Sequence, residues 1–424
     1  MRERLKSLVL ALLLLLAVGL SYLSLTLGLH TDGRGLLGTL LTDGNTTDIP
    51  TEETFSATPA ARPDSLCLLR SDGLYRAEGD FEGLWELVMP LYEEAMGSGS
   101  KPESLTGTAF SALLKPPALL ISYDSPQQLS LLRIWCDAPA EDSSLTVSTA
   151  VMCAADDGVI LAFRDGEGKC WKMSTAASVQ ELLELCSGEE KANAVLALSD
   201  PTYAALFPEE PVANGQLILP LYTADTVISA SASELPWPVL TAFSLNPYLA
   251  KIYPDAGGGL VYVEDRSTLA VTAEGDLVYS APEGGVAYEQ SANEDEATRA
   301  ARACEAAYQL LTNVWNELGA DGVLSLDSLQ YDESAGQYTL RFQLEVGGIF
   351  LYRADKYWAQ AVISDGQITD VTLCPRRLTA GENVTLIPMR QAAATLDGID
   401  QWRLRVLLQE RTDGVFEPAI CRMR

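Results

Sequence analysis

Histidine is nearly absent from this sequence, since His30 is the only one in 424 residues. The chain after it therefore cannot form a Ser-His-Asp triad, a Cys–His pair or a histidine-ligated metal site. No G-x-S-x-G or P-loop motif occurs, and the single G-x-G-x-x-G, at residues 33–38, follows no predicted strand. The sequence thus lacks the usual signatures of nucleophilic, phosphoryl-transfer and dinucleotide-dependent enzymes.

Cysteine is sparse and never occurs as C-x-x-C, which argues against zinc, iron–sulfur and thioredoxin-type sites. The density is also far below that of a disulfide scaffold. We expect most of the thiols to be buried and unpaired, with Cys153–Cys170 as the first pair to test because both lie on strands of one predicted meander. The eight are Cys67, Cys136, Cys153, Cys170, Cys186, Cys304, Cys374 and Cys421.

Basic residues are outnumbered, with 29 Lys and Arg against 58 Asp and Glu. Such a surface repels nucleic acid, so no nucleic-acid partner is expected. Adjacent carboxylates, including Asp156-Asp157 and Glu209-Glu210, fall in predicted turns, and no pair is singled out for catalysis. We expect no enzyme, cofactor or metal, with a carboxylate-based hydrolase as the alternative. Six tryptophans could line a glycan groove, but core packing is the simpler interpretation: Trp85, Trp171, Trp237, Trp315, Trp358 and Trp402.

One long apolar run is present, at residues 7–29, and it contains no charge. As a helix it would be roughly 34 Å long, enough to cross a bilayer core of about 30 Å. Arg2, Arg4 and Lys6 precede it, so the positive-inside rule predicts a cytoplasmic N-terminus, a single span in the plasma membrane and an extracytoplasmic bulk. A signal peptide cleaved near Ser21 is the alternative. Apolar residues continue to Leu29, which favours a retained anchor over residues 1–29.

Small residues define one face of this predicted transmembrane helix. Ala17, Ser21, Ser24 and Gly28 are spaced by four, three and four positions. Helices associate in lipid through close backbone approach and interhelical hydrogen bonds, both of which small residues favour. We therefore predict a partner-docking face there, although a chance spacing of small residues remains the alternative.

The remaining residues are too many for one core, so several domains are expected. A linker at 30–62 is rich in Gly, Thr, Asp and Pro, and extracytoplasmic units are predicted at 63–202, 203–290 and 291–424. Each combines predicted antiparallel strands with one or two helices. The expected class is α+β, with an N-terminal transmembrane helix ahead of these sheets.

Four local predictions can be compared directly with the structure. A helix is expected after Asp80, with Leu84, Leu87, Val88 and Leu91 on its apolar face and Pro90 as a kink or stop. A strand is expected at 129–135. Ser178 and Glu181 form a capping box, and Asn293 is available to cap a helix over 297–318.

Several segments together resemble the YycH family of membrane-anchored accessory proteins. They are 1–8 (MRERLKSL), 62–69 (RPDSLCLL), 72–75 (DGLY), 246–252 (NPYLAKI), 260–269 (LVYVEDRSTL), 386–392 (LIPMRQA) and 416–419 (FEPA). The family commonly ends its last strand with Pro-Ala-Trp, whereas this chain has Pro418-Ala419-Ile420. The related YycI proteins share the last two domains but are shorter, so three extracytoplasmic units favour YycH.

The resemblance implies a regulatory function. Such a protein would associate in the membrane with a WalK/YycG-like sensor histidine kinase and a YycI-like accessory protein. It would alter the activity of a kinase that controls cell-wall metabolism, without chemistry of its own. The alternative is an extracytoplasmic binding module for cell-wall glycan or peptide.

Overall fold

The computed structural model describes residues 62–424, except for 78–80, 139–143, 156–157, 189–190, 229–233, 291–293, 355, 397–400, 413 and 424. Helices are few and strands are mostly antiparallel, which confirms the expected α+β class. The predicted transmembrane helix at 1–29 lies outside the described residues. None of the helices that are described is both long and apolar enough to span a bilayer.

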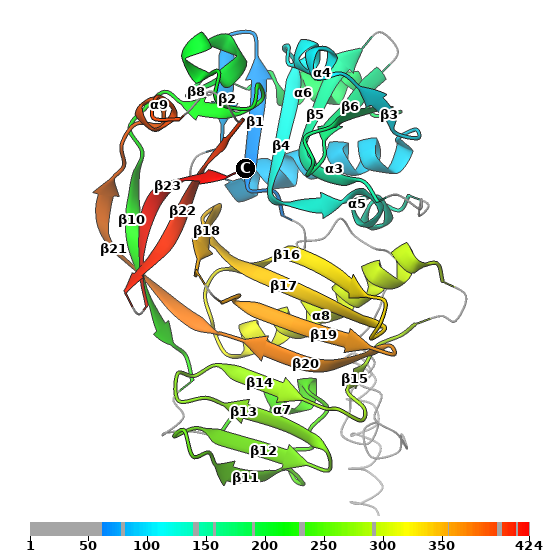
Figure 1. Cartoon of the computed structure of the whole chain (residues 1–424), viewed down its shortest axis with the longest axis vertical. Helices are drawn as coiled ribbons and strands as arrows, with labels where there is room; N and C mark the ends of the chain where they lie inside the picture. The colour runs from blue at the N-terminus through cyan, green and yellow to red at the C-terminus, as the bar shows by residue number, and fades with distance from the viewer. Residues whose placement is uncertain are drawn as a thin grey trace, which may run out of the picture. The chain divides into compact units, whose positions relative to one another are not determined.

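A first sheet of nine strands occupies the described residues up to position 213 (Figure 1). Its order is β3-β7-β6-β5-β4-β1-β2-β8-β9, with each neighbouring pair antiparallel. Its strands are β1 (Ser65–Arg70), β2 (Gly73–Arg76), β3 (Glu103–Leu105), β4 (Ala118–Gln128), β5 (Thr146–Ala155), β6 (Gly158–Arg164), β7 (Cys170–Ser174), β8 (Ala194–Leu196) and β9 (Pro211–Ala213).

Helices cover both faces of this sheet because its strands are apolar on both sides. Leu66 of β1 belongs to the same buried cluster as residues of α3 (Phe81–Ser98), α5 (Leu129–Trp135) and α6 (Val179–Leu185). Its neighbour Cys67 faces the other way and packs with Phe110 of α4 (Gly107–Leu113). Two short 3₁₀ helices, η2 (Ala197–Ser199) and η3 (Pro201–Tyr203), precede β9.

A second sheet contains fourteen strands within the described residues. Its order is β11-β12-β13-β14-β20-β19-β17-β18-β22-β23-β10-β21, with β15 beside β20 and β16 beside β17. The strands are β10 (Ile218–Thr226), β11 (Lys251–Pro254), β12 (Leu260–Glu264), β13 (Ser267–Val271), β14 (Leu277–Ser280), β15 (Val286–Ala287), β16 (Val323–Asp332), β17 (Gln337–Val346), β18 (Ile349–Tyr352), β19 (Ala359–Ser364), β20 (Gln367–Leu373), β21 (Arg376–Thr385), β22 (Arg403–Thr412) and β23 (Val415–Met423).

Strands from the predicted units 203–290 and 291–424 mix within this sheet. β14 pairs with β20, and β10 lies between β21 and β23. The parallel pair β18–β22 connects the central strands to the C-terminal hairpin. The two predicted units therefore share one set of hydrogen-bonded strands. The positions of the domain boundaries stay a prediction.

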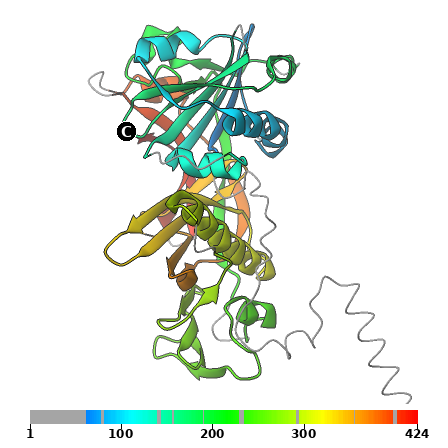
Figure 2. The ribbon, with the colours of Figure 1, turned by 90° about the vertical axis from the view of Figure 1, so that its right-hand side faces the viewer.

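Helix α8 (Glu296–Glu317) packs on β16, β17 and β19 of the second sheet (Figure 2). Its N-cap is Asp295, whose Oδ1 accepts the backbone N–H of Thr298 at 2.8 Å. Asn293, expected as the cap, lies outside the described residues. Helix α5 packs against α8, and α7 (Trp237–Ala242) does so too. The short α9 (Met389–Ala393) packs with β9 and η3.

The structure corrects two local predictions and confirms a third. Residues 129–135 form helix α5. All seven are buried, including the polar Ser130 and Arg133, so this short segment has no exposed face whose period would distinguish a helix from a strand. Pro90 does not stop helix α3, which continues to Ser98, and whether it kinks the helix stays a prediction. Leu87, expected on the apolar face, lies on the solvent side with 66% of its surface exposed. The capping box is confirmed, since the N–H of Glu181 donates to Ser178 Oγ at 3.3 Å.

All eight cysteines are free. The expected Cys153–Cys170 pair is wrong because β6 lies between their strands, with Cys153 opposite Ile160 and Cys170 opposite Arg164. Two strand spacings amount to roughly 9.5 Å, beyond the about 7 Å that a disulfide spans between Cα atoms.

Candidate functional site

Arg62 is the first described residue, and it is buried. Its guanidinium forms an ion pair with Glu82 of α3, and its Nε lies 3.5 Å from Glu345 Oε2 on β17. It also lies over the ring of Phe81, 5.6 Å from the centroid. One arginine therefore contacts both helix α3 and β17 of the second sheet.

Asp64, two residues on, makes the second connection. Its Oδ2 lies 2.5 Å from Arg405 Nε on β22, and Arg405 Nη1 lies 2.8 Å from Glu210 Oε1. Glu210 also accepts the backbone N–H of Leu404 at 3.1 Å. Burial raises the pKa of Glu210, whereas the charges of Arg405 and Arg403 oppose that rise. Two carboxylates thus share one buried arginine, and they connect β1, the loop before β9 and the C-terminal hairpin.

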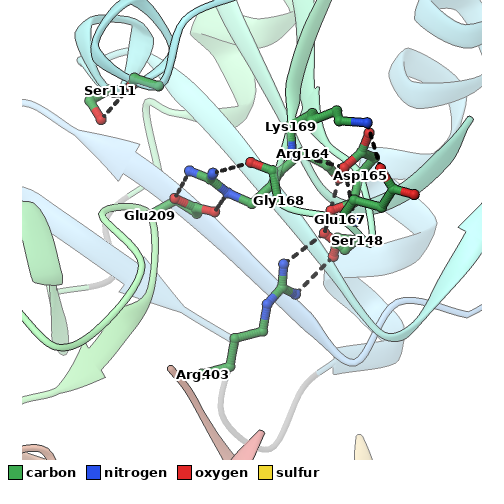
Figure 3. A network of polar contacts seen from close by, with 10 residues as sticks. Ser111, Ser148, Arg164, Asp165, Glu167, Gly168, Lys169, Glu209 and Arg403 are labelled. Carbon is green, nitrogen blue, oxygen red and sulfur yellow. Dashed lines mark hydrogen bonds and ion pairs between the residues drawn. The ribbon is translucent and has the colours of Figure 1, made fainter. Parts of the chain in front are cut away.

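Arg164 and Arg403 extend this network on the neighbouring side (Figure 3). Arg164 of β6 binds Glu209 with two parallel contacts, Nε–Oε1 at 2.5 Å and Nη2–Oε2 at 3.0 Å. Arg403 donates to the backbone oxygen of Ser148 at 3.1 Å and to its Oγ at 2.8 Å. Both guanidinium groups stack on Phe207, at 4.9 and 5.5 Å from its centroid.

These residues form what we call the junction network: Arg62, Asp64, Glu82, Ser148, Arg164, Glu209, Glu210, Arg403 and Arg405. Removing one partner of a buried ion pair leaves an uncompensated charge, which costs about 3–5 kcal/mol. The network therefore holds the C-terminal hairpin against the first sheet. Glu209 and Glu210 were expected in a turn, and their arginine partners were not predicted. The signal it could have used is Arg403-Leu404-Arg405, two charges on one face of a strand.

Two carboxyl groups near this network have strongly raised pKa values. Burial raises the pKa of Glu345 to about 7, although the charge of Arg62 opposes the shift. Burial, followed by the charge of Asp64, raises the pKa of Asp124 on β4 to about 6. Both carboxyl groups can therefore gain or lose a proton with a small change of pH near neutrality.

A polar cavity of about 320 Å³ lies between β4 and β16. Both strands are irregular here, since the register of β16 with β17 shifts between Leu326 and Ser328, and that of β4 with β5 shifts between Ser122 and Gln127. The cavity is lined by Ser125, Pro126, Gln127, Gln128, Leu131, Thr146, Leu326, Asp327, Ser328, Leu329 and Gln330. Two hydrogen bonds cross between the strands: Ser125 Oγ donates to Asp327 Oδ1 at 2.8 Å, and Gln127 Nε2 to Leu326 O at 3.2 Å.

The residues singled out from sequence lie elsewhere. The predicted docking face of Ala17, Ser21, Ser24 and Gly28 lies outside the described residues. Among the six tryptophans, Trp237 is exposed, and its ring contacts that of Tyr248 edge-on with 5.0 Å between the ring centroids. Trp85, Trp315 and Trp358 are buried. Within the described part of the chain, no group of three or more His, Cys, Asp or Glu residues is placed to hold a metal ion.

The architecture is that of an α+β protein whose two sheets are joined by buried ion pairs, and the chain has a YycH-like fold. Among solved structures it is similar to YycH from Bacillus subtilis, with a TM-score of 0.54 over 86% of this chain and 94% of that chain. The two sequences are 10% identical, so the likeness shows the fold. No protein-family model matches the sequence, and no curated protein matches it either.

Proposed function

We propose that this chain is a single-pass, membrane-anchored extracytoplasmic regulator of a sensor histidine kinase, acting by protein contact and without catalysis. The observation that carries the proposal is the YycH-like fold over 86% of the chain. The kinase would be WalK/YycG-like and control cell-wall metabolism, and a YycI-like accessory protein would be a second partner in the membrane.

The charged junction network supports a regulatory function over a catalytic one. Its carboxylates are paired with arginines in well-packed surroundings, as in Arg164–Glu209 and Arg405–Glu210. The small inner cavity beside Asp124 measures about 10 Å³, close to the minimum for one water molecule. This inner space is too small for the substrate that a hydrolase holds between its two carboxylates.

The experiment that tests the proposal is co-purification from native membranes. The tagged full chain is expected to bring down a sensor histidine kinase and a second single-pass protein. Replacing residues 7–29 by an unrelated transmembrane helix should reduce recovery of the kinase while leaving the protein in the membrane. A tagged chain that enriches no histidine kinase would contradict the proposal.

The anchor and its docking face are tested separately. Sequencing of the mature N-terminus is expected to find residues 1–29 retained, whereas an N-terminus near Tyr22 would show cleavage. Ser21→Leu with Ser24→Leu should weaken partner association in a two-hybrid assay, because the larger side chains prevent close helix approach. The matched control is Leu15→Ile with Leu23→Ile. An equal signal from both double variants would refute the docking face.

A further inference from the structure

β16 presents a free main-chain edge to the polar cavity. Among the described strands it pairs with β17 alone, so its other edge faces β4. Gln127 already occupies one position on that edge, since its Nε2 donates to Leu326 O at 3.2 Å. This is the bond that the N–H of an added strand would make. Beyond Leu326 the edge continues along the cavity as far as Gln330.

Unsatisfied polar groups gather around the same space. Ser328 Oγ is buried and has no hydrogen-bond partner among the described residues. Asp124 Oδ1 and Gln343 Oε1, which line the adjoining inner cavity, are likewise buried without a donor. Buried polar atoms are normally satisfied. The unpartnered Ser328 hydroxyl is therefore consistent with a ligand that brings hydrogen-bonding groups into the larger cavity, whereas the inner cavity beside Asp124 and Gln343 has room for about one water molecule.

The lining also restricts the class of ligand. Asp327 is the only charged residue of the larger cavity, which contains hydroxyls, amides and leucines but no aromatic ring. Sugar-binding sites commonly offer an aromatic face, so a glycan is disfavoured. Arg62 lines the inner cavity, but its charge is balanced by Glu82 and Glu345. The net charge near the opening thus favours a positively charged ligand.

We propose that this cavity binds an extended peptide segment, added as a strand to the free edge of β16 and carrying a basic side chain opposite Asp327. The main chain of the peptide would form hydrogen bonds with the edge of β16 beyond Leu326. The N–H and C=O groups of alternate peptide residues would point toward β16. The ammonium or guanidinium group of the basic side chain would form an ion pair with the carboxylate of Asp327. The inference rests on the proposed function only in assigning the ligand to the outside of the cell.

The test uses the full chain in nanodiscs and a fluorescent pentapeptide, acetyl-Thr-Val-Lys-Val-Thr-amide, measured by fluorescence anisotropy. Strand addition uses the N–H groups of alternate residues only. Methylating the backbone nitrogens of one alternate set is therefore expected to weaken binding at least about tenfold, whereas the other set should be tolerated. This comparison leaves the protein itself unchanged.

Protein variants test the basic side chain. The wild-type chain should prefer the Lys peptide over its Gln analogue by about tenfold, since charge-assisted hydrogen bonds are the stronger ones. Asp327→Asn should abolish that preference, while Glu333→Gln, an exposed carboxylate in the turn after β16, should retain it. Chitotetraose serves as the glycan probe.

Absence of saturable peptide binding would overturn the inference, and so would equal losses from both methylated sets. Binding of chitotetraose in place of the peptide would reassign the cavity to a glycan. Kinase co-purification is measured on the same wild-type and Asp327→Asn preparations. Recovery of the kinase by a wild-type chain that binds no peptide would reject this inference alone and leave the proposed function standing.

Discussion

Glu345 should make the stability of this protein depend on pH near neutrality. Burial raises its pKa from 4.5 to about 7 in the folded protein. Since the folded state holds the proton more tightly than the unfolded state, stability increases as pH falls from about 7 toward 4.5. At pH 8 the ionised carboxylate is expected to reduce the free energy of unfolding by about 3 kcal/mol, and at pH 5 by only about 1 kcal/mol.

Glu345→Gln isolates this effect, because glutamine keeps the size of the side chain and carries no charge. We expect the variant to be more stable than wild type by about 2 kcal/mol at pH 8, with most of that difference gone at pH 5. The assay is urea unfolding of the full chain in detergent, followed by tryptophan fluorescence. Glu382→Gln, an exposed position on β21, is the control and should behave as wild type.

Two results would refute the reasoning about Glu345. In one, the glutamine variant is no more stable than wild type at pH 8, which would mean that Arg62 fully compensates the buried charge. In the other, the difference is the same at pH 5 and pH 8, which would mean that the substitution acts through packing. Asp124, whose pKa burial raises to about 6, is present in both proteins, so its contribution is expected to cancel in the comparison.

Three further predictions concern stability and reactivity. Arg405→Met should reduce the free energy of unfolding by about 3–5 kcal/mol because Asp64 and Glu210 lose the buried cation that pairs with both. Arg411→Met, at an exposed ion pair with Glu417, should change it by less than about 0.5 kcal/mol. Urea unfolding measures both, and equal effects would contradict the junction network. Leu84→Ala should cost about 2–5 kcal/mol and Leu87→Ala almost nothing, and the reverse order would show that α3 is rotated. Cys67 and Cys304 should react with a thiol reagent only after denaturation, because both are buried and burial raises the pKa of each thiol; rapid labelling of the native protein at either position would disprove their burial.

Local patterns in the sequence were sufficient to predict many elements of the fold. The alanine-rich spacing of α8, the capping box at Ser178 and the hairpins of the second sheet follow from short-range chemistry. Helix α5 was missed because the segment is short and mostly apolar, and its two polar residues, Ser130 and Arg133, are buried with the rest. β21 was missed because its residues are mostly exposed and lack the alternation of a half-buried strand.

The candidate sites were beyond sequence reasoning for a different physical reason. Asp64, Glu210 and Arg405 meet only because β1, the loop before β9 and β22 are brought together by tertiary contacts. The polar cavity likewise depends on two register shifts, in β4 and β16, that no local sequence motif predicts. Charge pairs at such sequence separations cannot be assigned without coordinates or covarying positions.

The position of β1 determines how the protein responds to mechanical load. It lies between β4 and β2 in the middle of the first sheet, and Arg62 and Asp64 immediately precede it. Ladder bonds run across the strands, so tension applied at residue 62 along β1 shears both ladders at once. Tension on the edge strand β11 would instead peel its single ladder with β12 bond by bond. In optical tweezers, a handle at residue 62 should therefore sustain a higher unfolding force than one at residue 257, and equal forces would show that β1 carries no such load.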